Sequence, residues 1–266
     1  MHGLANNVCN GRGGRREPGR LHASVRIEPT IQMNLQPSEV VIIVFQLIAF
    51  LFAISIHESA HAWTANRCGD PTARMLGRVT LNPVKHIDPV GTILLPLIAA
   101  FTHLPILGWA KPTPVDPRNF KRPVAHDILT AVAGPVSNLI VAACSTAVLL
   151  VISLSSQHGR QLVHSLAAIN RFGFQGDETN SVLVPMTLFF YELMFINVVL
   201  AVFNLIPVPP LDGSHVLRHF LSDSVGRVYD ALGILALFAL VFLGGGLVWK
   251  AIQPFLNFFN SVLVSV

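Results

Sequence analysis

Long apolar runs constrain the fold of this chain more than any other feature. Five such runs are separated by polar segments, and a shorter one ends the chain. A helix needs about 20 apolar residues to cross the hydrocarbon core of a bilayer. Only 12% of the 266 residues are charged, against roughly 25% in a soluble domain. The sequence predicts an all-α polytopic membrane protein with five to six membrane helices; the runs are Val40–Ile56, Val90–Leu107, Ile128–Leu154, Ser181–Ile206, Ala231–Trp249 and Ile252–Val266.

The first 32 residues differ in composition from the rest. They contain five arginines and several glycines but no long apolar run, so a secretory signal is excluded. We expect residues 1–32 to be a disordered basic tail. Met33 as the natural start is the alternative, because the compact part of the chain begins there. Residues 33–266 are expected to form one membrane domain, since the connecting loops are too short to fold alone.

Composition also excludes other classes of protein. The cysteines, Cys9, Cys68 and Cys144, form neither a disulfide framework nor a CxxC metal pair. The net charge of +4 is spread over the loops without a dense basic stripe or a nucleic-acid-binding motif. We therefore expect the lipid bilayer, and no nucleic acid, among the partners.

The stretch His57-Glu58-Ser59-Ala60-His61 directly follows the first apolar run. Ionisable residues at membrane depth are costly, so they predict a functional site. Side chains at positions i and i+4 share one face of a helix, which allows both imidazoles to bind one Zn²⁺. Glu58 lies beside them, placed to act as the catalytic general base on a water molecule at the metal.

A catalytic zinc ion needs a third protein ligand and leaves its fourth position to water. Asp212, near the end of the segment 204–213 (NLIPVPPLDG), is the best candidate. The prolines of this segment break the preceding helix, so the carboxylate can be aimed at the site. N-capping of the next helix is the alternative role for Asp212. We expect one Zn²⁺ per chain, bound by His57, His61 and Asp212.

Basic residues predict on which side of the membrane the site lies. Loops 66–86 and 108–127 each contain four Lys or Arg residues, and loop 207–230 contains Arg218 and Arg227, whereas the two arginines of loop 155–180 are offset by Asp177 and Glu178. The positive-inside rule places the three basic loops in the cytosol. We then expect Val90–Leu107 to be a re-entrant segment, because a full crossing would place Asp212 on the other side of the membrane from the two histidines. We predict a multi-pass protein of the cell (inner) membrane whose active site faces the cytosol.

Three motifs together resemble the site-2 protease family of intramembrane zinc metalloproteases. They are HExxH at the end of an apolar helix, AGPVSN at 133–138 and NLIPVPPLDG at 204–213. The chain shows no stretch long enough for a PDZ or CBS domain, which indicates a compact prokaryotic type. The resemblance implies an endopeptidase that hydrolyses peptide bonds in or near transmembrane segments of membrane protein substrates, in regulated intramembrane proteolysis.

The resemblance also implies roles for residues outside the zinc site. Asn204 and Asn138 match polar positions that contact the substrate, although interhelical hydrogen bonding is an ordinary alternative for both. Gly108–Pro112 resembles a small membrane-associated β element that receives the substrate in extended form. A helical peptide bond is shielded by its own hydrogen bonds, so adding an unwound substrate to an exposed edge meets a physical need.

Two other functions compete with the protease interpretation. In a multi-pass metal-ion transporter, His and Asp residues would line a path, but transporters usually show repeated halves, and the ligand types occur here once. An inactive relative that only binds membrane partners is the second, and the intact HExxH and LDG segments argue against it. His215 and His219 form another i, i+4 pair, without a carboxylate between them, and are expected to be interfacial side chains.

Overall fold

The computed structural model describes residues 37–95, 97–98, 108–169 and 182–266. The predicted basic tail, residues 1–32, lies outside the described residues, and so does Met33. Within the described ranges the chain is helical and contains no strand, which confirms the all-α class. The small β element expected at Gly108–Pro112 is therefore not found as a strand.

Four helices in the described residues are long and apolar enough to cross a membrane. Each contains or overlaps one of the predicted apolar runs, because these runs have the length that a crossing helix needs. The predicted count of five to six crossing helices is not confirmed. The four are α1 (Pro37–Cys68), α4 (Pro123–Ser155), α6 (Leu183–Asn204) and α8 (Asp223–Phe242).

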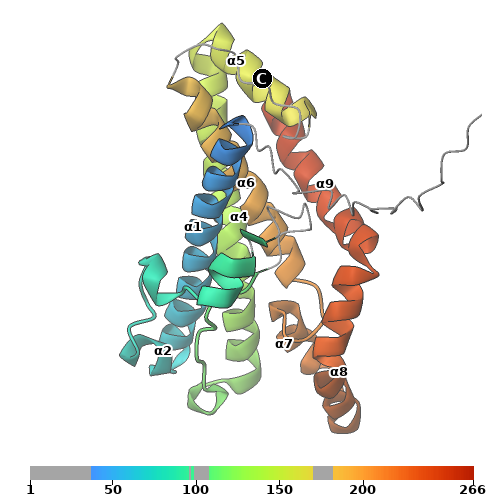
Figure 1. The fold of residues 1–266 in the computed structure, drawn as a ribbon. Coiled ribbons are helices and arrows are strands. Elements are labelled where there is room, and N and C mark those ends of the chain that lie inside the picture. Colours follow the sequence, from blue (N-terminus) through green and yellow to red (C-terminus); the bar gives the residue numbers. More distant parts are fainter. Residues whose placement is uncertain (1–36, 96, 99–107, 170–181) are drawn as a thin grey trace, which may run out of the picture. The chain divides into compact units, whose positions relative to one another are not determined.

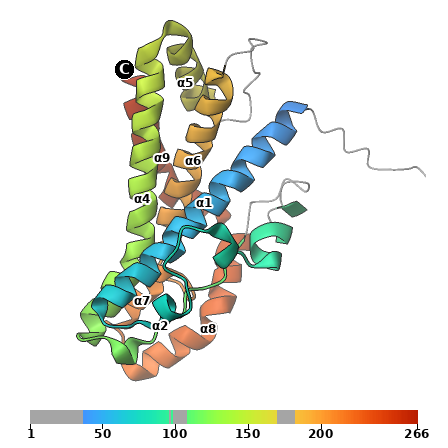
Figure 2. The same ribbon diagram turned by 90° about the vertical axis from the view of Figure 1, so that its left-hand side faces the viewer.

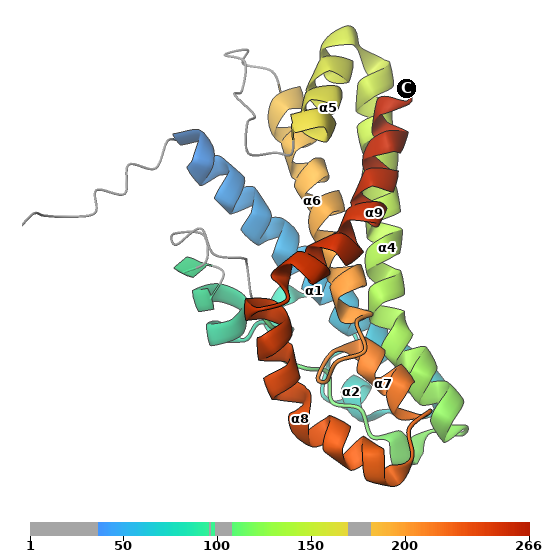
Figure 3. The same ribbon diagram turned by 90° about the vertical axis from the view of Figure 1, so that its right-hand side faces the viewer.

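The helices α1, α4 and α6 pack against one another, with α4 and α6 side by side and α1 crossing them at an angle (Figures 1 and 2). Fully buried alanines on α1 and α4 allow this close approach. Two further helices, α5 (Gln157–Ile169) and α9 (Gly245–Val264), pack against α4 and α6, toward the end of α4 from which α5 continues (Figure 3). They enclose a core that includes Leu149, Met194 and Leu263.

The predicted helix over Ala231–Trp249 is wrong in its bounds. The helix α8 ends at Phe242, and α9 begins at Gly245 and takes up the predicted short tail. Gly244, Gly245 and Gly246 lie at this break. Three consecutive glycines weaken a helix, because each loses much backbone freedom on folding.

The predicted active-site stretch lies inside a helix, because α1 continues beyond His61 to Cys68. The backbone N–H of Lys121 donates a hydrogen bond of 3.3 Å to the carbonyl of Cys68. The chain that leaves α1 therefore returns to the same end of the bundle before α4 begins. Of the run Val90–Leu107, the structure describes little more than the short helix η2 (Pro89–Leu94); residues 96 and 99–107 lie outside the described residues.

Asp70 holds together the long segment that connects the end of α1 to the start of α4. Its fully buried carboxylate accepts hydrogen bonds from the Thr72 backbone N–H and hydroxyl at 3.1 and 2.5 Å. It also accepts from the Asp116 N–H and the Asn119 amide, both at 2.8 Å. Burial alone would raise the pKa of Asp70, but these donors hold it below its usual value. The carboxylate thus ties residues 116–119 to the end of α1.

Candidate metal centre

Three predicted ligands meet at one point of the bundle. His57 and His61, one turn apart on α1, are buried, and their Nε2 atoms lie 3.0 Å apart. Asp212 begins α7 (Asp212–Arg218), and its Oδ2 lies 3.1 Å from Nε2 of His57. Its Oδ1 lies 3.4 Å from Nε2 of His61. Among the described residues, these form the one group of three His, Cys, Asp or Glu side chains whose ligand atoms lie within 4.8 Å of one another.

The donor atoms of this group fit a zinc ion. Nδ1 of His61 lies 2.7 Å from the carbonyl oxygen of Thr130, which can only accept. Nδ1 therefore carries the proton, and in the neutral ring the lone pair of Nε2 faces the site. Zinc bound tetrahedrally at about 2.1 Å from each ligand places neighbouring ligand atoms roughly 3.4 Å apart. The separations of 3.0, 3.1 and 3.4 Å are close to this value.

The chain after α6 aims Asp212 at the two imidazoles. Pro207, Pro209 and Pro210 cannot continue a helix. The N-cap of α7 is Leu211, and no side chain caps this helix, so the carboxylate of Asp212 serves the histidines and not the helix end. Burial alone would raise the pKa of Asp212, but the two imidazoles beside its carboxylate hold this pKa far below the usual range. Asp212 is thus an ionised candidate for the third ligand.

Gly134, within the AGPVSN segment, brings α4 close to the imidazoles. A Cβ atom at this position would lie 2.4 Å from Nε2 of His61 and 2.7 Å from Nε2 of His57. No side chain fits in that space. The absence of a side chain at Gly134 therefore leaves the room in which the ligand nitrogens converge.

The predicted catalytic residue, Glu58, is held by a loop residue that sequence analysis missed. The backbone N–H of Thr113 donates a hydrogen bond of 2.8 Å to Oε2 of Glu58. The Thr113 hydroxyl donates to the backbone carbonyl of Glu58 at 3.1 Å. The one available signal was the Pro-Thr-Pro sequence at 112–114, which fixes the backbone around a single N–H.

Comparison with known proteins identifies the family to which this chain belongs. The sequence profile of peptidase family M50 matches residues 45–244, which include His57, Glu58, His61 and Asp212. The chain belongs to peptidase family M50, the site-2 protease family. This confirms the resemblance seen in the sequence. The M50 protein is thus a metalloendopeptidase with zinc as its cofactor.

Several relatives of this M50 protein are similar over most of the chain. It is 36% identical over 219 residues to YwhC of Bacillus subtilis (strain 168), a provisionally named zinc metalloprotease, with 80% of this chain and 86% of YwhC covered. It is 29% identical over 203 residues to Rip2 of Mycobacterium tuberculosis (strain ATCC 25618 / H37Rv), with 76% of this chain and 66% of that protein covered. That protein is also provisionally named a zinc metalloprotease. No solved structure gives a significant match.

The two predicted substrate-binding asparagines lie in different surroundings. Asn138, one turn from Gly134 on α4, is fully buried, and neither atom of its amide has a hydrogen-bond partner among the described residues. Asn204, the last residue of α6, donates from Nδ2 to the carbonyl of Leu200 at 3.0 Å. Neither makes a described contact with a zinc ligand, and their roles in this M50 protein stay predictions.

A second group of charged residues holds α7 against α4. His219 Nε2 lies 2.8 Å from Oδ2 of Asp127, and His215 Nδ1 lies 3.5 Å from the same atom. The hydrogen bond with Asp127 raises the pKa of His215 above its ordinary value. The sequence predicted interfacial side chains here, since no carboxylate lies between the two histidines. It did not reveal Asp127, which lies 92 positions away from His219.

Glu192 of α6 is another residue that sequence analysis passed over. It is fully buried within an apolar helix of this M50 protein. A carboxylate inside such a run was itself a signal of a functional or interhelical polar contact.

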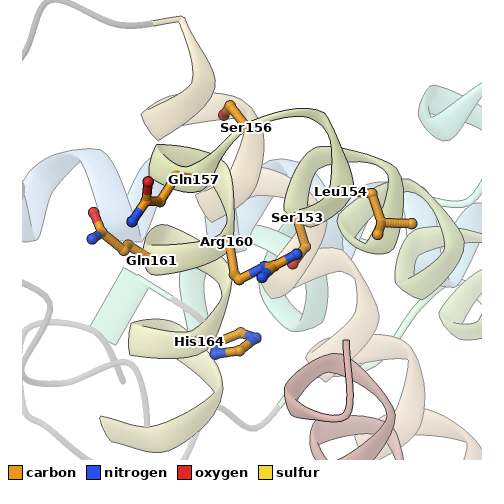
Figure 4. Close-up of a pocket in the computed structure, with 7 residues that line it drawn as sticks. All are labelled: Ser153, Leu154, Ser156, Gln157, Arg160, Gln161 and His164. Carbon is orange, nitrogen blue, oxygen red and sulfur yellow. The ribbon is translucent and has the colours of Figure 1, made fainter.

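A cavity of about 560 Å³ lies between the end of α4 and the start of α5. Figure 4 shows the Arg160 side chain reaching toward Ser153, with His164 on the next turn of α5. None of the zinc ligands lines this cavity, so it is separate from the metal centre.

Proposed function

We propose that this protein is a zinc-dependent intramembrane endopeptidase that hydrolyses peptide bonds in or near transmembrane segments of membrane protein substrates. The observation that carries the proposal is the convergence of His57, His61 and Asp212 within 4.8 Å. Two of these ligands lie on a helix that is apolar enough to cross a membrane. A zinc site in such a helix is suited to substrates that also reside in the bilayer. Regulated intramembrane proteolysis is the process to which this activity belongs.

The residues of the site divide the chemistry among themselves. Zinc, when bound by the two histidines and Asp212, supplies Lewis-acid polarisation of the scissile carbonyl and lowers the pKa of water. Glu58 takes a proton from the attacking water and passes it to the leaving amine. Thr130 fixes the tautomer of His61, so that its Nε2 stays available as a ligand.

Residues 108–113 support the binding of an extended substrate. The N–H of Trp109 donates to the carbonyl of Gly91 at 3.2 Å, and that of Lys111 donates to the carbonyl of His86 at 2.9 Å. Backbone N–H groups that bind the same side of the protein at every second residue are the pattern of an extended strand. The N–H and C=O of Ala110 have no hydrogen-bond partner among the described residues, and in an extended segment they would point to the opposite edge. An unwound peptide can add to that edge as a strand.

The two asparagines are proposed as further substrate contacts. The buried amide of Asn138 lies one turn from Gly134, where α4 meets the imidazoles. Asn204 ends α6, directly before the segment that delivers Asp212. Asn138 therefore lies one helical turn from the glycine that approaches the imidazoles, and Asn204 lies shortly before Asp212 in the chain.

The proposed location is the cell (inner) membrane, with the metal centre toward the cytosolic side. Basic loops support this orientation through the positive-inside rule. The hydrogen bond from Lys121 to Cys68 supports a net return of the intervening chain to one side. We therefore propose that Val90–Leu107 enters the membrane and comes back, without a full crossing.

A cleavage assay with purified protein tests the proposed function. The protein in detergent is incubated with a model membrane protein that carries one transmembrane segment, with and without a zinc chelator. We expect cleavage within or beside that segment, loss of cleavage with the chelator, and recovery on adding Zn²⁺. Absence of cleavage, together with zinc flux into proteoliposomes that contain the protein, would favour the metal-ion transporter instead.

A further inference from the structure

Thr113 presents a single, fixed hydrogen-bond donor. Its neighbours Pro112 and Pro114 have no backbone N–H, so the amide of Thr113 is the one donor on the main chain from 112 to 114. A residue that precedes proline is confined to extended backbone conformations, which restricts both Lys111 and Thr113. The segment therefore presents one N–H in a restricted conformation, and this N–H lies 2.8 Å from Oε2 of Glu58.

We propose that Thr113 is a positioning residue for the catalytic base, which it holds through its backbone amide. This inference rests on the proposed function, in which Glu58 moves the proton. A glutamate side chain has several rotatable bonds and loses conformational entropy when it is held in place. The charge-assisted hydrogen bond to Oε2 fixes one carboxylate oxygen, which leaves Oε1 for the reacting water. A second hydrogen bond joins the same two residues, because the Thr113 hydroxyl donates to the backbone carbonyl of Glu58 at 3.1 Å.

The structure anchors Thr113 on both sides along the chain. Before it, the N–H of Lys111 donates to the carbonyl of His86 at 2.9 Å. After it, the N–H of Asp116 donates to the buried carboxylate of Asp70 at 2.8 Å. A donor held in this way can impose a position on the side chain that it binds, whereas a mobile loop would follow that side chain.

The two edges of the segment then have separate tasks. The N–H groups of Trp109, Lys111 and Thr113 face the protein, and the last of them holds the base. The N–H of Ala110 faces the edge that we propose for the substrate. Removing the N–H of Thr113 should therefore impair the chemical step, and removing the N–H of Ala110 should impair substrate binding.

Backbone amide-to-ester substitution separates these tasks without changing a side chain. Cell-free translation with α-hydroxy acids removes the N–H at position 113, at position 110 or, as a control, at Val115, whose N–H is unbonded among the described residues. We expect the ester at 113 to lower kcat about 10- to 100-fold with KM within about twofold. The ester at 110 should mainly raise KM, and the ester at Val115 should change neither. Bound zinc, measured in each protein, should be unchanged.

Hydrogen exchange provides a test that needs no activity. The Thr113 amide should exchange about tenfold or more faster in Glu58→Ala than in the unchanged protein, because its acceptor is lost. Asp212→Ala, which removes a zinc ligand but leaves Glu58, should not change that exchange.

The inference fails if the ester at 113 leaves kcat unchanged in a protein that cleaves, or if Glu58→Ala leaves the exchange of Thr113 unchanged. Equal effects of the esters at 113 and 110 on kcat and KM would likewise overturn it. Absence of chelator-sensitive cleavage in the unchanged protein contradicts the proposed function instead. The exchange result would still decide whether Thr113 holds Glu58.

Discussion

Gly134 of α4 lies so close to His61 of α1 that a Cβ atom on the glycine would be 2.4 Å from the imidazole Nε2. The imidazoles of His57 and His61 therefore occupy the volume that a side chain at position 134 would need. Gly134→Ala must push α4 and α1 apart or displace the imidazoles. We expect bound zinc to fall well below one equivalent, with parallel loss of cleavage. Elemental analysis of purified protein measures this, and Gly245→Ala is the matched control because its Cβ would meet nothing within 4 Å.

Glu58→Gln separates metal binding from chemistry. Glutamine keeps the shape of the side chain and an acceptor for the Thr113 N–H, but it cannot take a proton. We expect full zinc content and a loss of kcat of about 10²- to 10⁴-fold. Full activity in this variant would remove Glu58 from the mechanism.

Asp212→Ala tests the third ligand. The carboxylate lies 3.1 and 3.4 Å from the two imidazole nitrogens, and its loss leaves two ligands where catalytic zinc sites use three. We expect lower zinc content in the purified protein and loss of cleavage. Unchanged zinc stoichiometry would show that the third ligand lies elsewhere.

Asp127→Ala removes the shared partner of His215 and His219. Because these histidines hold α7 against α4, and α7 carries Asp212, we expect about 10-fold weaker zinc binding, as for other residues that orient a ligand. Competition with a chelator of known affinity measures it. Asp230→Asn serves as the control, because Asp230 pairs with Arg218 at 3.0 Å but its side chain is 55% exposed. An equal effect of both variants would contradict a specific role for Asp127.

Asp70→Asn should lower the free energy of unfolding by roughly 1–3 kcal/mol. The reason is that an amide cannot accept all the hydrogen bonds that the buried carboxylate accepts. The pKa of Asp70 is lower in the folded protein than its ordinary value of 3.8. Its contribution is therefore complete above about pH 4 and is lost as the pH falls below that value. Melting curves in detergent from pH 3 to 7 should show the two proteins converging in acid. A constant difference across this range would contradict the assignment.

The sequence was sufficient to predict the four long apolar helices and a possible metal site of His57, His61 and Asp212, because local rules account for most of both. Apolar runs of sufficient length form crossing helices, and the i, i+4 spacing of His57 and His61 places them on one face. Asp212 could be added because catalytic zinc needs a third ligand. These predictions required no knowledge of how distant segments pack.

The features that were missed depend on contacts between distant parts of the chain. Thr113 lies 55 positions from Glu58, and Asp127 lies 92 positions from His219. The expected β element was not confirmed as a strand among the described residues. The N–H groups at 109, 111 and 113 bond to the carbonyls of Gly91 in η2 and of His86 and to the Glu58 side chain. Within the described residues, no second strand pairs with these N–H groups.

The hydrogen bond between Lys121 and Cys68 closes the excursion from α1 to α4 into a loop with coincident ends. Residues can therefore be added to or removed from this excursion without inverting the direction of α4, α6 or α8. A change in the length of this loop would therefore leave His57, His61 and Asp212 at the same end of the bundle.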